Sequence, residues 1–124
     1  MTLQQVLDYF EKNYPNANVH KQPESNPLEL ICEIDPTEGH PNYSVAISAI
    51  SASVPHKHNV GVEEYEVLSG TILLSVDGTI KTLYEREKAT INPGQVHSAT
   101  STEGYALVKV TSQPGWTQAD HILT

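Results

Sequence analysis

The sequence predicts an all-β domain that is preceded by one short helix. Short apolar or alternating segments recur between turn signals about every eight to twelve residues, which is typical of β-sandwiches and β-barrels. The 124 residues suit a single domain with a core of its own. Within it we expect an N-terminal helical extension over residues 1–25, a barrel over 28–111 and a C-terminal tail over 112–124.

The helix is predicted over residues 3–13. Thr2 is suited to cap it, and Gln5 stands at the position of the capping-box partner. Asn13 and Pro15 end the pattern. Four apolar residues at helical spacing share one face, which should lie on an apolar surface of the sheet: Leu3, Val6, Leu7 and Phe10.

The first three strand candidates are residues 28–34, 43–54 and 65–68. The first contains Leu30-Ile31-Cys32 and is closed by a proline. The second is rich in β-branched and small residues, and the third stops before Gly70. Each therefore has both the composition and the boundary of a strand.

The last four strand candidates are residues 71–76, 79–83, 89–91 and 105–111. The first two flank Asp77-Gly78, which is a strong signal for a two-residue hairpin. The other two are followed by Pro-Gly turns that begin at Pro93 and Pro114.

Composition excludes several classes of function. The formal net charge is −8, with six lysines and a single arginine, Arg86, so the chain lacks the clustered cations that neutralise phosphates. No apolar run approaches the roughly 18 residues that cross a bilayer, and the start has no secretory signal pattern. The one cysteine, Cys32, forms no internal disulfide and is not proposed as a nucleophile. We expect a cytoplasmic protein without nucleic-acid or membrane partners.

Four residues could converge on one point. His56 and His58 are two apart, so their side chains share a face of a strand. Glu63 follows after a glycine-containing stretch that could turn and bring it beside them on a neighbouring strand. His97 stands at a strand boundary after the turn at Pro93. Taken singly, a His-x-His pair is equally typical of a polar strand end, and Glu63 of a surface charge.

Together these side chains form a donor set for one divalent transition metal. Three imidazoles and a carboxylate suit iron, manganese, zinc or nickel, whereas calcium prefers more oxygens. A structural zinc site usually carries thiolates, and only one cysteine exists here. In a six-coordinate ion, four protein ligands leave two positions for water or substrate.

The spacing of these residues resembles the two motifs of the cupin superfamily. His56-Lys57-His58, four residues, Glu63, six residues and Gly70 resemble the first motif, and the segment 93–97 resembles the second. The resemblance implies a small RmlC-like jelly roll, also called a double-stranded β-helix. It also implies that His56, His58, Glu63 and His97 hold a metal at the barrel mouth, and that the chain is a homodimer.

The sequence departs from the family pattern at four positions. The family usually has glycine, glycine, proline and asparagine where this chain has Ile50, Arg86, Asn92 and Ser101. These are mostly turn positions, so the departures concern loop shape more than the ligands. Glycine permits unusual backbone angles, and we therefore expect the loop at Arg86 to differ from the usual one.

Other polar residues have weaker assignments. Tyr65 shares the face of Glu63 and should line the cavity, either as a catalytic proton donor or only as part of the wall. Glu64 is an alternative ligand, although the spacing to Gly70 favours Glu63. Trp116 should pack the C-terminal tail onto the barrel or a partner subunit. Four residues are expected at the surface: His20, His40, His121 and Lys109.

Two classes of function fit this pattern. One is a metalloenzyme acting on a small organic molecule, either by oxygen-dependent (dioxygenase) chemistry or as an isomerase or lyase. The alternative is a non-catalytic module that binds a metal and a small molecule. A sugar-nucleotide epimerase shares the implied fold, but the retained metal set and the single arginine count against it. A proton-transfer group near the metal would favour an enzyme.

Overall fold

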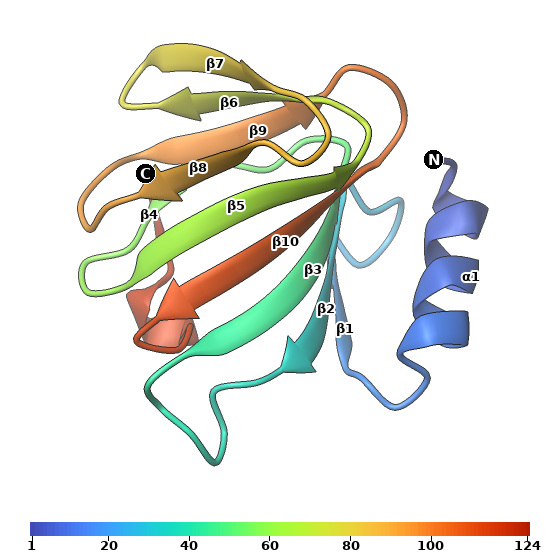
Figure 1. Cartoon of the computed structure of the whole chain (residues 1–124), viewed down its shortest axis with the longest axis horizontal. Helices are drawn as coiled ribbons and strands as arrows, with labels where there is room; N and C mark the ends of the chain where they lie inside the picture. The colour runs from blue at the N-terminus through green and yellow to red at the C-terminus, as the bar shows by residue number, and fades with distance from the viewer.

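The chain folds into two antiparallel sheets that face each other, with one helix packed on the outside (Figure 1). The computed structural model describes residues 1–124. One sheet has the strand order β1-β2-β3-β10-β5-β8, and the other has the order β11-β4-β9-β6-β7. The elements are α1 (Leu3–Asn13), β1 (Val19–Gln22), β2 (Glu29–Asp35), β3 (Ser44–Ile50), β4 (His56–Lys57), β5 (Val62–Ser69), β6 (Ile72–Val76), β7 (Thr79–Leu83), β8 (Lys88–Ile91), β9 (His97–Ser101), β10 (Ala106–Gln113), a 3₁₀ turn (Gln118–Asp120) and β11 (Ile122–Leu123).

The predicted helix is confirmed, with the predicted capping box. The Gln5 backbone N–H donates to Thr2 Oγ1 at 3.2 Å, and the Thr2 backbone N–H donates to Gln5 Oε1 at 2.9 Å. Val6 and Phe10 are buried against the outer face of the six-stranded sheet. No helix in the chain combines the length and the hydropathy that crossing a membrane requires.

Removing the cap is expected to weaken the attachment of this helix. Thr2→Ala loses the acceptor for the Gln5 amide and should lower the free energy of unfolding by about 1 kcal/mol. Urea unfolding followed by circular dichroism measures the effect. Thr117→Ala, which removes the equivalent cap of a single 3₁₀ turn, serves as the comparison and should cost less. Equal losses in both variants would contradict this account of the helix.

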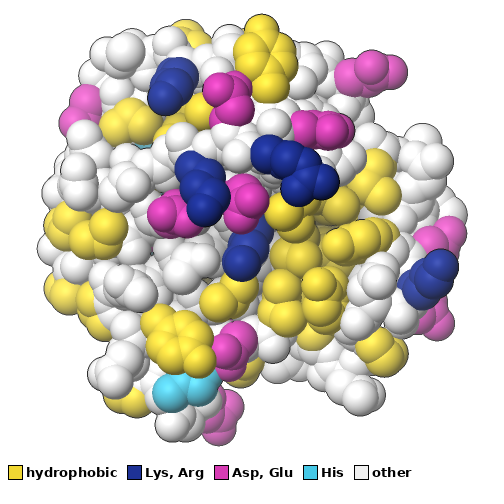
Figure 2. All heavy atoms as spheres, in the orientation of Figure 1, with side chains coloured by type: hydrophobic (Ala, Val, Ile, Leu, Met, Phe, Trp, Pro, Cys, Tyr) yellow, Lys and Arg dark blue, Asp and Glu magenta, His cyan; other side chains and the backbone are white.

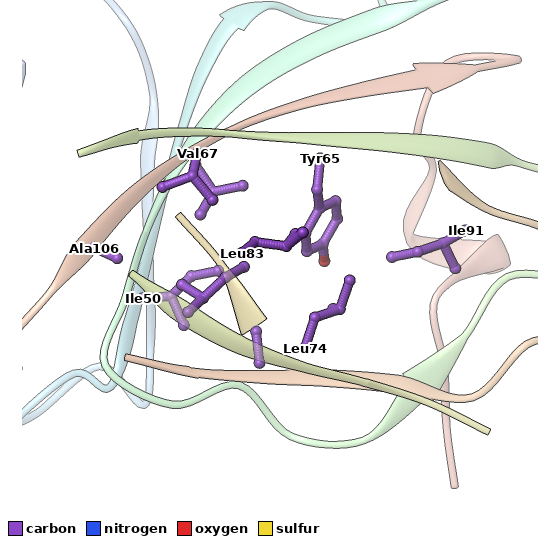
Figure 3. Packing of buried hydrophobic residues seen from close by; sticks show 10 residues of the cluster. Ile50, Tyr65, Val67, Leu74, Leu83, Ile91 and Ala106 are labelled. Atoms are coloured by element: carbon purple, nitrogen blue, oxygen red, sulfur yellow. The ribbon is translucent and has the colours of Figure 1, made fainter. Parts of the chain in front are cut away.

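Two separate apolar clusters hold the fold together. The larger one lies between the sheets at one end of the barrel (Figure 3). The smaller one lies between α1 and the outer face of the six-stranded sheet. The members of the larger cluster are Ile50, Tyr65, Val67, Ile72, Leu74, Leu83, Ile91, Ala99, Ala106 and Val108; those of the smaller are Val6, Phe10, Leu30, Cys32, Ile47, Ala49 and Leu107.

The second cluster determines which face of β2 points into the barrel. Leu30 and Cys32 point outward because the helix covers them, and the alternate residues Glu29, Ile31 and Glu33 line a cavity inside the barrel. Hydrophobic residues on the outside of a sheet are stable only under such a cover. The helix therefore frees one inner wall of the barrel to be polar.

Two strands lie outside the expected barrel limits. The segment 1–25 was expected to be a helical extension, but β1 within it pairs antiparallel with β2, with Val19 opposite Cys32. The segment 112–124 was expected to be a tail, but β11 pairs with β4, with Leu123 opposite His56. Both strands are short and lack the apolar alternation on which the prediction depended.

The turns follow the predicted chemistry. Asp77 and Gly78 both have positive φ, as a type I′ hairpin requires. Arg86 has a φ of +69°, a left-handed conformation that glycine adopts more readily, and the expected difference of this loop from the family's usual one stays a prediction. Gly70, at φ +86°, has Ala106 so close that an added Cβ would lie 3.2 Å from the alanine side chain.

The outer face of β5, β8 and β10 is charged, as Figure 2 shows by the lysine, arginine and carboxylate side chains gathered over this sheet. Lys109 lies opposite Glu66 and is exposed, which confirms its predicted surface position. Lys88 lies 3.8 Å from Glu64 in an exposed ion pair. Glu64 therefore belongs to the solvated face and not to the ligand set.

Candidate metal centre

Three segments from the two sheets bring the predicted ligands together. His56 lies in β4, opposite His97 in the adjacent β9, and His58 follows β4 directly. Glu63 lies in β5, which belongs to the other sheet. The expectation that Glu63 sits on a strand neighbouring the histidines is therefore wrong. The connection over residues 58–62 crosses between the sheets, so Glu63 faces the histidines across the barrel.

The four side chains form one compact and buried cluster. His56, His58, Glu63 and His97 each offer one ligand atom, and these atoms all lie within 4.8 Å of one another. Glu63 Oε1 is 3.2 Å from Nε2 of His58 and 3.2 Å from Nε2 of His97. The side chain of His97 has no exposed surface, and those of His58 and Glu63 are 4 % and 6 % exposed.

Backbone carbonyls fix the same tautomer in all three histidines. Each Nδ1 faces a carbonyl oxygen, so Nδ1 carries the hydrogen that it donates and Nε2 presents a lone pair to the centre of the cluster. The Nδ1-to-oxygen distances are 2.9 Å from His56 to Val54, 2.8 Å from His58 to Asp120 and 3.2 Å from His97 to Gln95.

This arrangement fits a cation. Nε2 of His58, Nε2 of His97 and Oε1 of Glu63 are buried and have no hydrogen-bond partner in the protein. Lone pairs that face one another at 3.2 Å repel unless a proton or a metal ion lies among them. Imidazole nitrogen and carboxylate oxygen are donors suited to divalent transition metals. The site could therefore hold one such ion, with the tautomers already set.

The electrostatics of the cluster reflect burial and mutual attraction. Burial lowers the pKa of His56 to about 4, so this imidazole is neutral at pH 7. Burial acts to raise the pKa of Glu63, but the neighbouring His58 and His97 outweigh it and lower the pKa to about 2. Burial likewise opposes the charged form of His58, and the Glu63 carboxylate outweighs it and raises the pKa.

A cavity of about 300 Å³ opens beside the cluster, and His56 and Glu63 form part of its wall. Tyr65 also lines it, as predicted, and hangs from β5 into the barrel among Leu74, Leu83 and Ile91 (Figure 3). Burial, and then the carboxylates of Glu63 and Glu29, raise the pKa of Tyr65 well above its usual value, so its hydroxyl stays protonated. A role for Tyr65 as a proton donor stays a prediction.

The C-terminal segment supplies residues that the sequence did not point to. His121 was expected at the surface, but it is half-buried, lines the cavity and stacks on His56 with ring centroids 4.4 Å apart. This prediction was wrong because β11 ties the segment to β4. Trp116 lines the same cavity and packs near His121, with centroids 5.9 Å apart. His20 is exposed, as expected. His40 is half-buried beside Asp35.

Asp120 organises the loop between His58 and Glu63. Its carboxylate accepts backbone N–H groups from Asn59 at 2.7 Å, Val60 at 3.1 Å and Gly61 at 2.9 Å. Its carbonyl oxygen accepts the Nδ1–H of His58. One residue therefore fixes both the course of the crossover and the tautomer of a ligand. The only signal in the sequence was an acidic residue near the end of the chain.

Replacing Asp120 should weaken metal binding without removing a ligand. Asp120→Ala keeps the carbonyl that faces His58 Nδ1 but frees the three backbone amides of the loop after His58, which loosens the position of both, so we expect a loss of about 10- to 100-fold in metal affinity. Competition with a chromophoric chelator measures it. Asp8→Ala, an exposed aspartate on α1, is the control and should leave affinity unchanged. Unchanged affinity in Asp120→Ala would mean that the crossover holds His58 without this contact.

Comparison with known proteins identifies the fold. No protein-family model and no curated protein sequence matches the chain. Among solved structures, it resembles a Streptomyces PAC13 variant with uridine, at a TM-score of 0.74, 12 % identity and coverage of 89 % of this chain and 86 % of that one. A further Pac13 structure is that of a protein called a unique nucleoside dehydratase.

Two further structures give the same result. A double-stranded β-helix protein of unknown function from Klebsiella pneumoniae has a TM-score of 0.69 and 22 % identity, covering 81 % of this chain and 87 % of that one. An RmlC-like cupin from Shewanella frigidimarina has a TM-score of 0.67 and 14 % identity, covering 82 % and 86 %. At these identities the likeness establishes the fold alone, and it confirms the double-stranded β-helix implied by the motifs.

Proposed function

We propose that this chain, which has the double-stranded β-helix fold of the cupins, is a metal-dependent lyase or isomerase acting on a small organic molecule. The observation that carries the proposal is the convergence of three Nε2 atoms and Glu63 Oε1 at the wall of a cavity. Two of these nitrogens and the oxygen have no hydrogen-bond partner in the protein. A divalent ion held there would act as a Lewis acid on a carbonyl or hydroxyl oxygen of the substrate.

The protein's own residues favour proton transfer as the accompanying chemistry. Lyases and isomerases need a group that accepts and returns a proton close to the polarised oxygen. The cavity that contains His56 and Glu63 also contains Glu29 and His121, neither of which belongs to the ligand set. Tyr65 adds a hydroxyl that remains protonated. A Streptomyces protein of the same fold is described as a dehydratase, which is a lyase reaction.

The size and charge of the cavity limit the substrate. About 300 Å³ equals the space of roughly ten water molecules, which suits a small molecule and excludes a polymer. None of the 19 lining residues is lysine or arginine, so the wall offers no cation to a phosphate. This charge pattern disfavours the sugar-nucleotide epimerase considered from sequence.

Elemental analysis of untagged protein, purified without chelators, is the first test. About one divalent transition metal per chain is expected. The loaded protein is then incubated in D₂O with small hydroxy-carbonyl compounds and followed by NMR, with an oxygen electrode in parallel. Deuterium incorporation or loss of water without oxygen uptake supports the proposal. Oxygen uptake would show a dioxygenase, and a loaded protein inert in both assays would show a binding module.

The assembly and the location of the protein stay predictions. The resemblance implies a homodimer, which sedimentation equilibrium would test directly. A cytoplasmic location follows only from the sequence pattern. Neither is needed for the proposed chemistry, because all four ligands and the cavity lie within one chain.

A further inference from the structure

The wall of the cavity away from the metal ligands is acidic. β2 points Glu29, Ile31 and Glu33 into the barrel because α1 covers its other face. β1 adds His20 and Gln22, and β3 adds Ser44 and Ser48. Two carboxylates thus stand on a wall that contains no lysine or arginine. Because the apolar face of β2 points toward α1, its polar face forms this wall of the cavity.

Glu29 on this wall has one hydrogen-bonded oxygen and one oxygen without a partner in the chain. One carboxylate oxygen, Oε2, accepts a hydrogen bond from Ser48 Oγ at 2.7 Å. The other oxygen, Oε1, makes no hydrogen bond in the protein, and no cation pairs with the group. Burial raises the pKa of Glu29, which reflects the cost of a carboxylate held in this place. A carboxyl group on a cavity wall that has one oxygen without a donor is a candidate for binding a ligand.

Several other polar groups of the cavity are already engaged. Ser44 Oγ accepts the backbone N–H of Trp116 at 2.9 Å, and Thr37 Oγ1 donates to the Trp116 carbonyl at 2.6 Å. Ser112 Oγ donates to the carbonyl of Pro114 at 2.8 Å. Glu33 lies 3.3 Å from His20. Glu29 Oε1 therefore remains an acceptor on this wall that a donor group of a ligand can engage.

We propose that Glu29 is the specificity residue of this cavity and that it binds the ammonium group of a small amine. The inference rests on the proposed function in that it places the substrate between this wall and the metal ligands. An ammonium group donates to Oε1 and also balances the negative charge of this half-buried carboxylate, whereas a hydroxyl group can only donate a hydrogen bond. The ring of Trp116 on the same cavity offers an aromatic face that also favours a cation.

The test uses the only tryptophan of the chain, Trp116, as a reporter within the cavity. Benzylamine, benzyl alcohol and benzoate share a ring and differ in the charge of the attached group. Each is titrated at pH 7 into protein of measured metal content, as purified and after chelation, while Trp116 fluorescence is followed. Benzylamine is expected to bind about tenfold or more tightly than benzyl alcohol, and benzoate more weakly than either in the chelated protein.

Isosteric variants assign the effect to one residue. Glu29→Gln keeps an acceptor for Ser48 and should reduce the affinity for benzylamine by about tenfold, with the alcohol unchanged. Glu38→Gln, an exposed glutamate in the loop after β2, is the matched control and should bind like the wild type. If Glu29→Gln fails to fold, Glu33→Gln should show the same loss in smaller degree, because His20 already offsets that charge.

Three results would overturn the proposal. They are equal binding of amine and alcohol, a preference that survives in Glu29→Gln (or in Glu33→Gln where the first variant does not fold), and the absence of amine binding at tens of millimolar. The comparison before and after chelation separates this inference from the proposed function. If the protein prefers the amine but binds no metal, the role of Glu29 is supported and the proposed metalloenzyme is contradicted. If the protein binds metal but shows no preference for the amine, the proposed function stands and the role of Glu29 is contradicted.

Discussion

Alanine at position 97 is expected to abolish stable metal binding while the barrel stays folded. His97 supplies an Nε2 atom with no hydrogen-bond partner, and its side chain is fully buried on β9, the strand between β4 and β6. Outer contacts of a metal ligand are already worth about 10- to 100-fold in affinity, so loss of the ligand itself should exceed about 100-fold. His56→Ala and His58→Ala should behave in the same way. Elemental analysis and chelator competition provide the measurement.

Two controls keep this experiment specific. His20→Ala removes an exposed imidazole from the rim of the same cavity and should keep full occupancy. Circular dichroism should show an intact fold in every variant, because the two apolar clusters contain none of the three histidines. Full metal occupancy in all three ligand variants would contradict the site, and the proposed Lewis-acid chemistry would fall with it.

The convergence of the four predicted residues could be predicted because it depends on spacing along the chain. His56 and His58 lie two apart, and the intervals to Glu63 and His97 matched a pattern whose three-dimensional outcome is known. The course of the chain between these residues was less predictable than the residues themselves. Glu63 reaches the cluster from the opposite sheet, which one-dimensional alternation does not reveal.

The residues that were missed share a physical cause. Glu29 and Glu33 alternate with apolar residues as in any half-buried strand, so the pattern alone places them toward solvent. The helix inverts that outcome by covering Leu30 and Cys32 from outside. His121 and Asp120 act through contacts with residues about 60 positions earlier in the chain, and such pairings leave no periodic signal.

Acid should destabilise the metal-free protein through His56. Burial holds its pKa at about 4 in the folded state, against 6.5 for the free side chain. Between these values the unfolded chain binds a proton that the folded chain refuses, so the free energy of unfolding falls as pH drops from 6.5 toward 4. This lowering of the His56 pKa corresponds to a loss of about 2 to 3 kcal/mol in the free energy of unfolding between pH 7 and pH 4.5.

The neighbouring groups determine how much of this loss is visible. His121 also has a pKa lowered by burial and adds to it. His58, whose pKa Glu63 raises above 6.5, adds stability as pH falls from that raised pKa to 6.5, and this gain is complete below 6.5. Glu63 has a pKa of about 2 and stays ionised throughout. The contribution of His56 must therefore be isolated by difference, with urea unfolding of chelated wild type and His56→Asn compared at both pH values.

In His56→Asn the amide can still donate to the carbonyl of Val54, but it does not titrate. Between pH 7 and pH 4.5 the free energy of unfolding of the variant should fall by about 2 to 3 kcal/mol less than that of the wild type, whatever the stability of the variant at pH 7. His20→Asn, in which an exposed histidine is replaced, should retain the wild-type dependence. An unaltered pH dependence in His56→Asn would mean that this imidazole titrates normally in the folded chain. It would then reach pH 7 partly charged, and a metal would have to displace a proton from it rather than enter a cluster already neutral at that position.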